Sequence, residues 1–204
     1  MTASAQTTAR LLIVGPQGSG KGTQGVRISE ALGIPVVSTG DIFRANIKAG
    51  TELGQQVTAI LQAGDLVSDE LTGALVRDRL AQPDAVNGFL LDGYPRNAAQ
   101  VVQLDDLLAE SGTALDAVIL LDVPRDEVFA RLKIRAAEQG RADDTDEGIT
   151  HRLDIYERET TPILEAFGAR GLVDRIDGVG GLDEITERIF AALAARGIVD
   201  GAAA

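Results

Sequence analysis

The chain has 204 residues, of which 31 are Asp or Glu and 19 are Lys or Arg, so its formal charge at pH 7 is −12. A hydrophobic share of 45% at this length predicts a single globular domain over residues 1–204. The acidic excess argues against a nucleic-acid binder, and the absence of cysteine with only one histidine excludes disulfides and makes structural zinc unexpected.

Short apolar runs alternate with stretches of helical periodicity along the chain. This alternation predicts an α/β fold: a five-stranded parallel sheet with helices on both faces, whose ligands bind beyond the carboxyl ends of the strands. Residues 42–81 contain no strand and are expected to form a helical excursion. In chain order we expect strand 11–14, a helix after residue 20, strand 35–38, helices 41–49, 51–63 and 68–81, strand 89–91, helix 97–110, strand 118–121, helix 125–137, a polar loop 138–148, a helix from 149 to an interruption at Pro162, strand 173–176 and helix 182–193.

Features of membrane and exported proteins do not occur in the sequence. No apolar run reaches the roughly 18 to 20 residues of a membrane span. The first nine residues have neither the basic nor the apolar part of an export signal. We therefore expect a cytoplasmic protein with no membrane partner. Because no apolar helical stripe is left over once the sheet is covered, we expect a monomer.

A glycine-rich segment separates the first expected strand from the first helix. Residues 15–21 match the pattern Gly-x4-Gly-Lys. In this pattern backbone amides point at phosphate oxygens, the helix adds its positive end, and the lysine reaches the terminal phosphates. A plain glycine turn is the alternative, but the flanking strand and helix favour a phosphate-binding loop, or P-loop. Gly22 follows Lys21 and the hydroxyl comes only at Thr23, unlike the loop of GTPases and motor ATPases.

Four sequence blocks, taken together, resemble the adenylate kinases. They are 20–24 (GKGTQ), 38–44 (STGDIFR), 88–96 (GFLLDGYPR) and 140–144 (GRADD), in the order and spacing of that family. The resemblance covers residues 11–193. It implies a reversible transfer, ATP + AMP to 2 ADP, that uses Mg²⁺ bound with ATP.

The resemblance also implies a division of the chain. The core would comprise 10–37, 68–133 and 145–196, the helical AMP-binding segment 38–67, and the lid 134–144. Only five residues separate Arg135 from Arg141. The lid therefore resembles the short form of the family, without the four-cysteine zinc cluster of some longer members.

Site residues carried over by this resemblance fall into four groups. ATP would be bound by Gly18, Ser19, Gly20, Lys21, Gly22, Thr23, Arg131, Arg135 and Gly180. AMP would be bound by Thr39, Arg44, Asp65, Leu66, Val67, Gly93, Tyr94, Pro95, Arg96, Gln100, Arg141 and Arg152. Catalysis would depend on Lys21, Arg96, Arg135, Arg141 and Arg152. Mg²⁺ would be held through water by Asp92, with Asp41 as a weaker candidate.

Structural explanations compete with several of these roles. Arginine on a helix usually faces solvent, and aspartate at the end of a strand is often a helix cap. Asp143 and Asp144 are expected to shape the lid rather than to bind metal. His151 is expected to be a surface residue of a helix.

The identity of the phosphate acceptor is open at this point. Kinases of UMP and CMP share this plan and often have Asn after Pro-Arg, as Asn97 stands here. Two other positions favour AMP: Thr39, where those relatives usually have Ala, and Gln100, whose amide can read an adenine edge. A polar group left unpaired by the wrong base costs about 1 to 3 kcal/mol. A regulatory protein that binds ATP without transferring phosphate is a further alternative.

Overall fold

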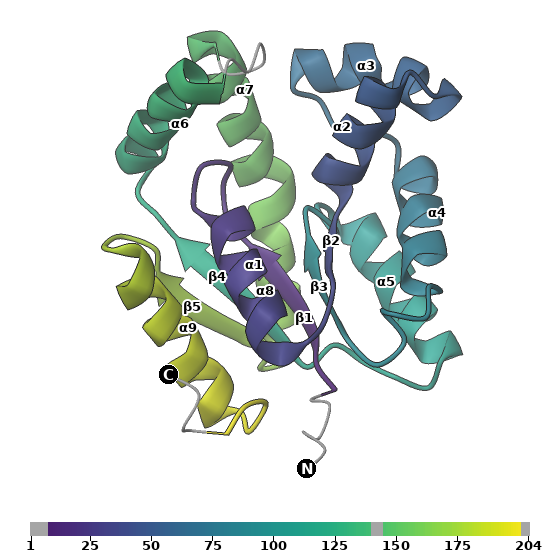
Figure 1. The fold of residues 1–204 in the computed structure, drawn as a ribbon, viewed down its shortest axis with the longest axis vertical. Helices are drawn as coiled ribbons and strands as arrows, with labels where there is room; N and C mark the ends of the chain where they lie inside the picture. Colours follow the sequence, from purple (N-terminus) through teal and green to yellow (C-terminus); the bar gives the residue numbers. More distant parts are fainter. Residues whose placement is uncertain (1–7, 140–144, 201–204) are drawn as a thin grey trace.

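The computed structural model describes residues 8–139 and 145–200, with the backbone alone at 135–139. Within these ranges five strands form one sheet in which every pairing is parallel. The strands are β1 (Arg10–Val14), β2 (Val36–Ser38), β3 (Phe89–Asp92), β4 (Ala117–Asp122) and β5 (Val173–Asp177). The spatial order β2-β3-β1-β4-β5 puts the end of β1, where the glycine-rich segment begins, at the centre of the carboxyl edge. The predicted parallel α/β sheet is thereby confirmed (Figure 1).

Helices follow the strands in the predicted alternation. Several begin at a side-chain cap: Ser38, Thr51, Ser68 and Asn97 each accept a hydrogen bond from the backbone N–H three residues further on. None of the helices in the described part of the chain has the length and apolarity needed to cross a bilayer. The helices are α1 (Lys21–Leu32), α2 (Thr39–Ala49), α3 (Glu52–Ala63), α4 (Asp69–Leu80), α5 (Ala98–Glu110), α6 (Arg125–Gln139), α7 (Asp146–Ile155), the π-helical turn η1 (Tyr156–Thr160), α8 (Thr161–Ala169) and α9 (Leu182–Ala195).

Both faces of the sheet are covered by helices, as expected. Ile13 and Ile119 pack with α1 and α9 on one face. Their chain neighbours Leu12 and Leu120 pack with α4, α5 and α8 on the other. Because successive residues of a strand point to opposite faces, the central strands supply both cores and are apolar throughout. The pair α2 and α3 and the pair α6 and α7 rise on either side above the carboxyl edge (Figure 1).

The region between α6 and α8 differs partly from the expected elements. We expected a loop over 138–148 and a helix from Ile149, whereas α6 continues to Gln139 and α7 begins at Asp146. The earlier start has a local cause, because the Thr145 hydroxyl accepts a hydrogen bond from the Gly148 N–H at 3.1 Å and caps the helix. The interruption expected at Pro162 is confirmed by η1, which ends just before it. Proline has no N–H to continue the helical hydrogen bonds, and a π turn accommodates that gap.

Gly25 lies inside α1 and is buried, where glycine is less favourable than alanine. A Cβ added there would meet Leu90 Cδ2 at 3.4 Å, an ordinary van der Waals contact. We therefore expect Gly25→Ala to raise the free energy of unfolding by about 0.5 to 1 kcal/mol, because alanine restricts the unfolded chain and fits the helix. Denaturant unfolding followed by circular dichroism measures the change.

Gly54 in α3 provides the matched contrast. A Cβ there would lie 2.3 Å from the backbone oxygen of Asn46, which cannot move aside as a flexible side chain can. We expect Gly54→Ala to lower the free energy of unfolding by about 1 to 3 kcal/mol. If the free energy of unfolding changed in the same direction in both variants, this account of helix packing would be contradicted.

Candidate active site

The glycine-rich loop connects β1 to α1 and has a backbone that only glycine adopts easily. Gly18 has φ 87°, and a Cβ on it would lie 2.8 Å from Leu132 Cγ. The Lys21 ammonium donates to the carbonyls of Gly15 at 2.7 Å and Pro16 at 2.9 Å. This places Lys21 at the loop whose amides are expected to bind phosphate. The remaining expected loop residues are buried Ser19 and, around the first turn of α1, Gly20, Gly22 and Thr23.

A second cationic group lies where β3 ends. Arg96 Nε donates to the Gly93 carbonyl at 2.8 Å, and the Thr39 hydroxyl donates to the same oxygen at 3.0 Å. Burial lowers the pKa of the Arg96 guanidinium; Asp92 opposes that shift and the cation of Arg44 adds to it. Two neighbouring cations, one of them desolvated, form an arrangement that an oxyanion stabilises.

The turn after Arg96 holds the side chain expected to read the base. Gln100 is 2% exposed, and its Oε1 accepts from the Arg96 backbone N–H at 2.8 Å. Its Nε2 donates to Asp69 at 2.7 Å. Sequence reasoning missed Asp69, because an acid in the first turn of a helix is ordinary there. The two residues before Arg96, Tyr94 and Pro95, are buried and joined by a cis peptide bond.

Thr160 is a second residue that sequence reasoning missed. It lies in η1, is 6% exposed, and donates from its hydroxyl to the Arg96 backbone oxygen at 3.0 Å. Pro162 indicated an interrupted helix, but not that a π turn would direct this hydroxyl at residue 96. Both backbone polar groups of Arg96 are thus held by side chains from α5 and η1.

The end of α3 meets α7 across the carboxyl edge. His151 Nε2 and Asp65 Oδ1 are 2.8 Å apart, and a Cβ on Gly64 would lie 3.0 Å from Arg152 Cγ. His151 is exposed on its helix, as expected, but it also has this partner on a distant segment. The expected AMP-binding run Asp65, Leu66 and Val67 therefore adjoins Arg152, and Val67 anchors the run in a small apolar core with Phe43 and Val57.

On the side expected to bind ATP, Arg131 reaches the loop before α9. Its NH2 group donates to the Gly178 carbonyl at 3.0 Å and its Nε to Glu127 at 2.8 Å, so it adjoins the segment that contains Gly180. Arg135 follows in α6, where only the backbone is described. Arg141, Asp143 and Asp144 lie outside the described residues.

Asp92 and Asp41 are the two carboxylates expected near Mg²⁺. Asp92 ends β3 and pairs in register with Ile13 of β1 and Ser38 of β2, at the edge that carries the glycine-rich loop. The Asp41 carboxylate accepts a hydrogen bond from Arg44. Among the described side chains, no group of three or more His, Cys, Asp or Glu is arranged to hold a metal. A Mg²⁺ that is carried by phosphates needs only one or two carboxylates, and Asp92 suits that mode.

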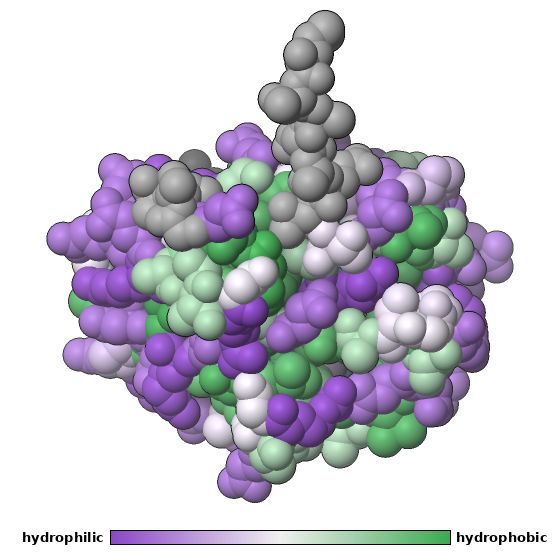
Figure 2. All heavy atoms as spheres, turned by 90° about the horizontal axis from the view of Figure 1, so that it is seen from below, coloured by the Kyte–Doolittle hydropathy of each residue, from purple (hydrophilic) through white to green (hydrophobic). Residues whose placement is uncertain are grey.

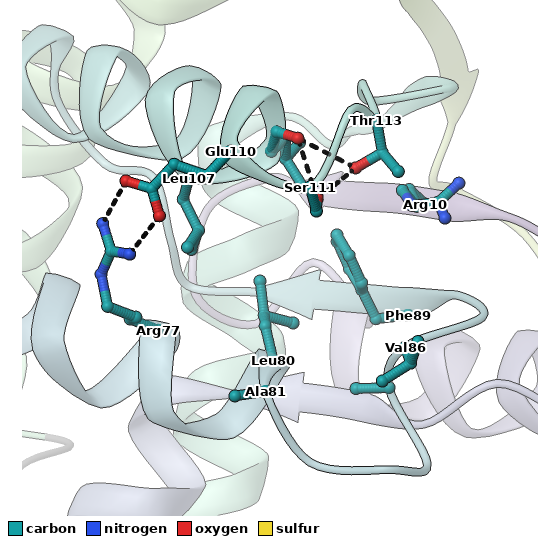
Figure 3. A pocket seen from close by; sticks show the side chains of 12 residues that line it. Arg10, Arg77, Leu80, Ala81, Val86, Phe89, Leu107, Glu110, Ser111 and Thr113 are labelled. Carbon is teal, nitrogen blue, oxygen red and sulfur yellow. Dashed lines mark hydrogen bonds and ion pairs between the residues drawn. The ribbon is translucent and has the colours of Figure 1, made fainter.

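A cavity of about 580 Å³ lies at the opposite, amino edge of the sheet. Its walls include Phe89, the first residue of β3, with Leu80 and Leu107, and Arg77 is paired with Glu110 at its rim (Figure 3). Seen from below, this end of the molecule is a mixture of apolar and polar surface (Figure 2). Parallel sheets bind ligands at the carboxyl edge, and the two cationic groups lie there. We therefore assign the candidate active site to that edge.

Comparison with known proteins shows which family the chain resembles. Residues 13–172 match the family model described as adenylate kinase. An adenylate kinase of Clavibacter michiganensis is 60% identical over 189 residues, 93% of this chain and 94% of the relative. One from Leifsonia xyli is 59% identical over 93% of this chain and 95% of its own length. One from Stenotrophomonas maltophilia is 52% identical over 91% of this chain and all of its own length.

Tyr94 gives this region a pH-dependent contribution to stability. Burial, with a further contribution from Asp69, raises the pKa of its hydroxyl to about 12. The contribution is complete below the unfolded pKa near 10 and is lost as the pH rises toward 12, because the unfolded chain releases the proton first. We expect the free energy of unfolding to fall by about 2 kcal/mol more in wild type than in Tyr94→Phe between pH 9 and 12. Denaturant titrations across this range test it, and parallel pH curves would contradict it.

Proposed function

The chain belongs to the adenylate kinase family, and on that premise we propose how its own residues carry out phosphoryl transfer. Membership of the family supports nucleoside monophosphate kinase activity, ATP + AMP = 2 ADP. Residue roles, Mg²⁺ dependence and closure of a lid are our proposals. The observation that carries them is the half-buried Arg96, held by the Gly93 carbonyl at 2.8 Å and beside the cation of Arg44, at the sheet edge that also holds Lys21.

The transfer needs positively charged side chains and aligned substrates rather than a general base. A phosphate oxygen of AMP attacks the γ-phosphorus of ATP, and the bond from that phosphorus to the bridging oxygen of the β-phosphate breaks, so that both products are ADP. The attacking oxygen is already ionised near neutral pH. No proton has to be removed, which suits a site whose cationic side chains are lysine and arginine.

The cations divide the work between the two nucleotides. Lys21 and the amides of the glycine-rich loop bind the ATP phosphates, Arg131 assists them, and Gly180 lies near the adenine. Arg44 and Arg96 bind the AMP phosphate. Their pre-arranged charge stabilises the transferring group without reorganisation of water. Arg135, Arg141 and Arg152 complete the set of cations around the transferred phosphate.

Mg²⁺ and the lid have supporting roles. Mg²⁺ bound with ATP would be held through water by Asp92, with Asp41 as the weaker candidate, and it would neutralise part of the phosphate charge. Residues 134–144 act as a short lid that keeps water away from the transferable phosphate. The resemblance to the short-lid members of the family supports this role.

A monomer in the cytoplasm is our proposal for the state in which the enzyme works. The exposed large apolar side chains of the described residues are dispersed over several elements, among them Val26 on α1, Val102 on α5 and Ile134 on α6. Dispersed residues of this kind are normal on the surface of a monomer.

Lys21→Ala and Arg96→Ala test the site directly. Each removes a positive donor, so we expect kcat/KM for ADP formation to fall by about 10²- to 10³-fold while the fold is retained. A coupled assay of ADP formation measures the loss, and circular dichroism checks the fold. Arg170→Ala is the control, because this arginine pairs with Asp105 on the surface, and we expect its rate to match wild type. Near-normal turnover in either site variant would overturn the assignment.

The acceptor is tested with the wild-type protein. The protein is mixed with ATP, Mg²⁺ and one of AMP, CMP or UMP. We expect kcat/KM to be highest with AMP as the acceptor. The buried amide of Gln100, beside the phosphate-binding cations, supports this preference. Faster turnover of CMP or UMP would identify a pyrimidine kinase instead. Binding of ATP with no ADP formed from ATP and AMP would favour the regulatory alternative.

A further inference from the structure

One carboxylate oxygen joins α4 to the turn that carries the base-reading amide. Asp69 Oδ1 accepts from Gln100 Nε2 at 2.7 Å and from Asn97 Nδ2 at 2.9 Å. Asn97 is itself the cap of α5, since its Oδ1 accepts from the Gln100 backbone N–H at 2.9 Å. The three side chains therefore form one connected hydrogen-bonded group that joins the start of α4 to the start of α5.

The two partners of Gln100 leave its amide only one direction. An ionised carboxylate accepts hydrogen bonds and cannot donate them, so it must face the Nε2 group. The backbone N–H of Arg96 donates, so it must face Oε1. If the amide were flipped, Oε1 would face the Asp69 carboxylate, two acceptors together, and Nε2 would face the Arg96 N–H, two donors together. Gln100 is 2% exposed, and polar atoms left unpaired at such a buried position are costly.

We propose that Asp69 is a positioning residue that holds the Gln100 amide in one direction and thereby sets which nucleobase edge the acceptor site selects. The proposal rests on the proposed function, in which Gln100 meets the base of AMP. One Nε2 hydrogen is bound to Asp69, and one Oε1 lone pair accepts from Arg96. The amide therefore presents its second hydrogen and its second lone pair to the base, with the donor and the acceptor in a fixed order.

This order distinguishes bases of the same size. Adenine offers an amino donor next to a ring-nitrogen acceptor and pairs with a glutamine amide through two hydrogen bonds. Hypoxanthine, the base of inosine monophosphate (IMP), offers a carbonyl acceptor next to an N–H donor, which is the reverse order. A fixed amide accepts the first edge and leaves unpaired groups against the second, whereas an amide that can turn accommodates both.

The experiment compares AMP with IMP as acceptors, with ATP and Mg²⁺ present. For Asp69→Ala we expect KM for AMP to rise and the ratio of kcat/KM for AMP over IMP to fall about tenfold, because the charged anchor of the amide is gone. KM for ATP should stay at the wild-type value. Asp69→Asn keeps an acceptor oxygen, and we expect it to recover most of the ratio. If IMP turns over too slowly, the ratio of equilibrium dissociation constants replaces it.

Glu70→Ala is the matched control. Glu70 is the next acid in the same helical turn and is exposed, so its removal has the same effect on the helix charge and should leave the AMP to IMP ratio unchanged. If Asp69→Ala does not fold, Asp69→Ser, which keeps a polar group but is too short to reach Gln100, is expected to lower the ratio in the same way.

The possible results separate the two proposals. A wild type that forms no ADP from ATP and AMP overturns the proposed function and the role of Asp69 together. A wild type that uses AMP, with an unchanged AMP to IMP ratio in the folded Asp69 variant, overturns the role of Asp69 alone. Equal losses of kcat/KM with AMP and with IMP would indicate that the Asp69 carboxylate is purely structural, and they would also overturn its proposed role.

Discussion

The three hydrogen bonds that hold one half-buried cation, Arg96, are the constraint on which the arrangement of the site depends. A cation that loses part of its water is costly unless it is hydrogen-bonded and well placed. Its Nε is held by the Gly93 carbonyl, its backbone N–H by Gln100 and its backbone oxygen by Thr160. Since these partners come from β3's end, α5 and η1, fixing this one residue also fixes the relation between three elements of the core.

The same constraint couples recognition of phosphate to recognition of base. The guanidinium of Arg96 belongs to the proposed phosphate site, while its backbone N–H holds the amide proposed to read the base. Asp69 holds the other end of that amide. A base that binds out of place would therefore disturb the turn that holds Arg96. Base specificity and the rate of transfer are connected through this turn.

The net charge of −12 does not show how charge is distributed over the molecule. Surface arginines such as Arg125 and Arg170 pair with acids, and exposed pairs of this kind contribute little to stability. At the carboxyl edge Arg44 pairs with Asp41 as well, but it also lies close enough to Arg96 to lower the pKa of that guanidinium. Cations thus meet at this edge although the chain as a whole is acidic. In the proposed function, this arrangement lets an acidic protein bind two polyanions.

The sequence by itself determined the sheet, the glycine-rich loop and the family, because strand patterns, glycine spacing and short motifs such as 15–21 are local properties of the chain. Its assignment of arginines to the nucleotides stays a prediction, and it did not show how those arginines are held. Only the tertiary structure brought Asp69 to Gln100, Thr160 to Arg96 and Asp65 to His151. Each of these pairs joins residues 31 to 86 positions apart, and a hydrogen bond between such residues depends on how helices pack rather than on any local pattern.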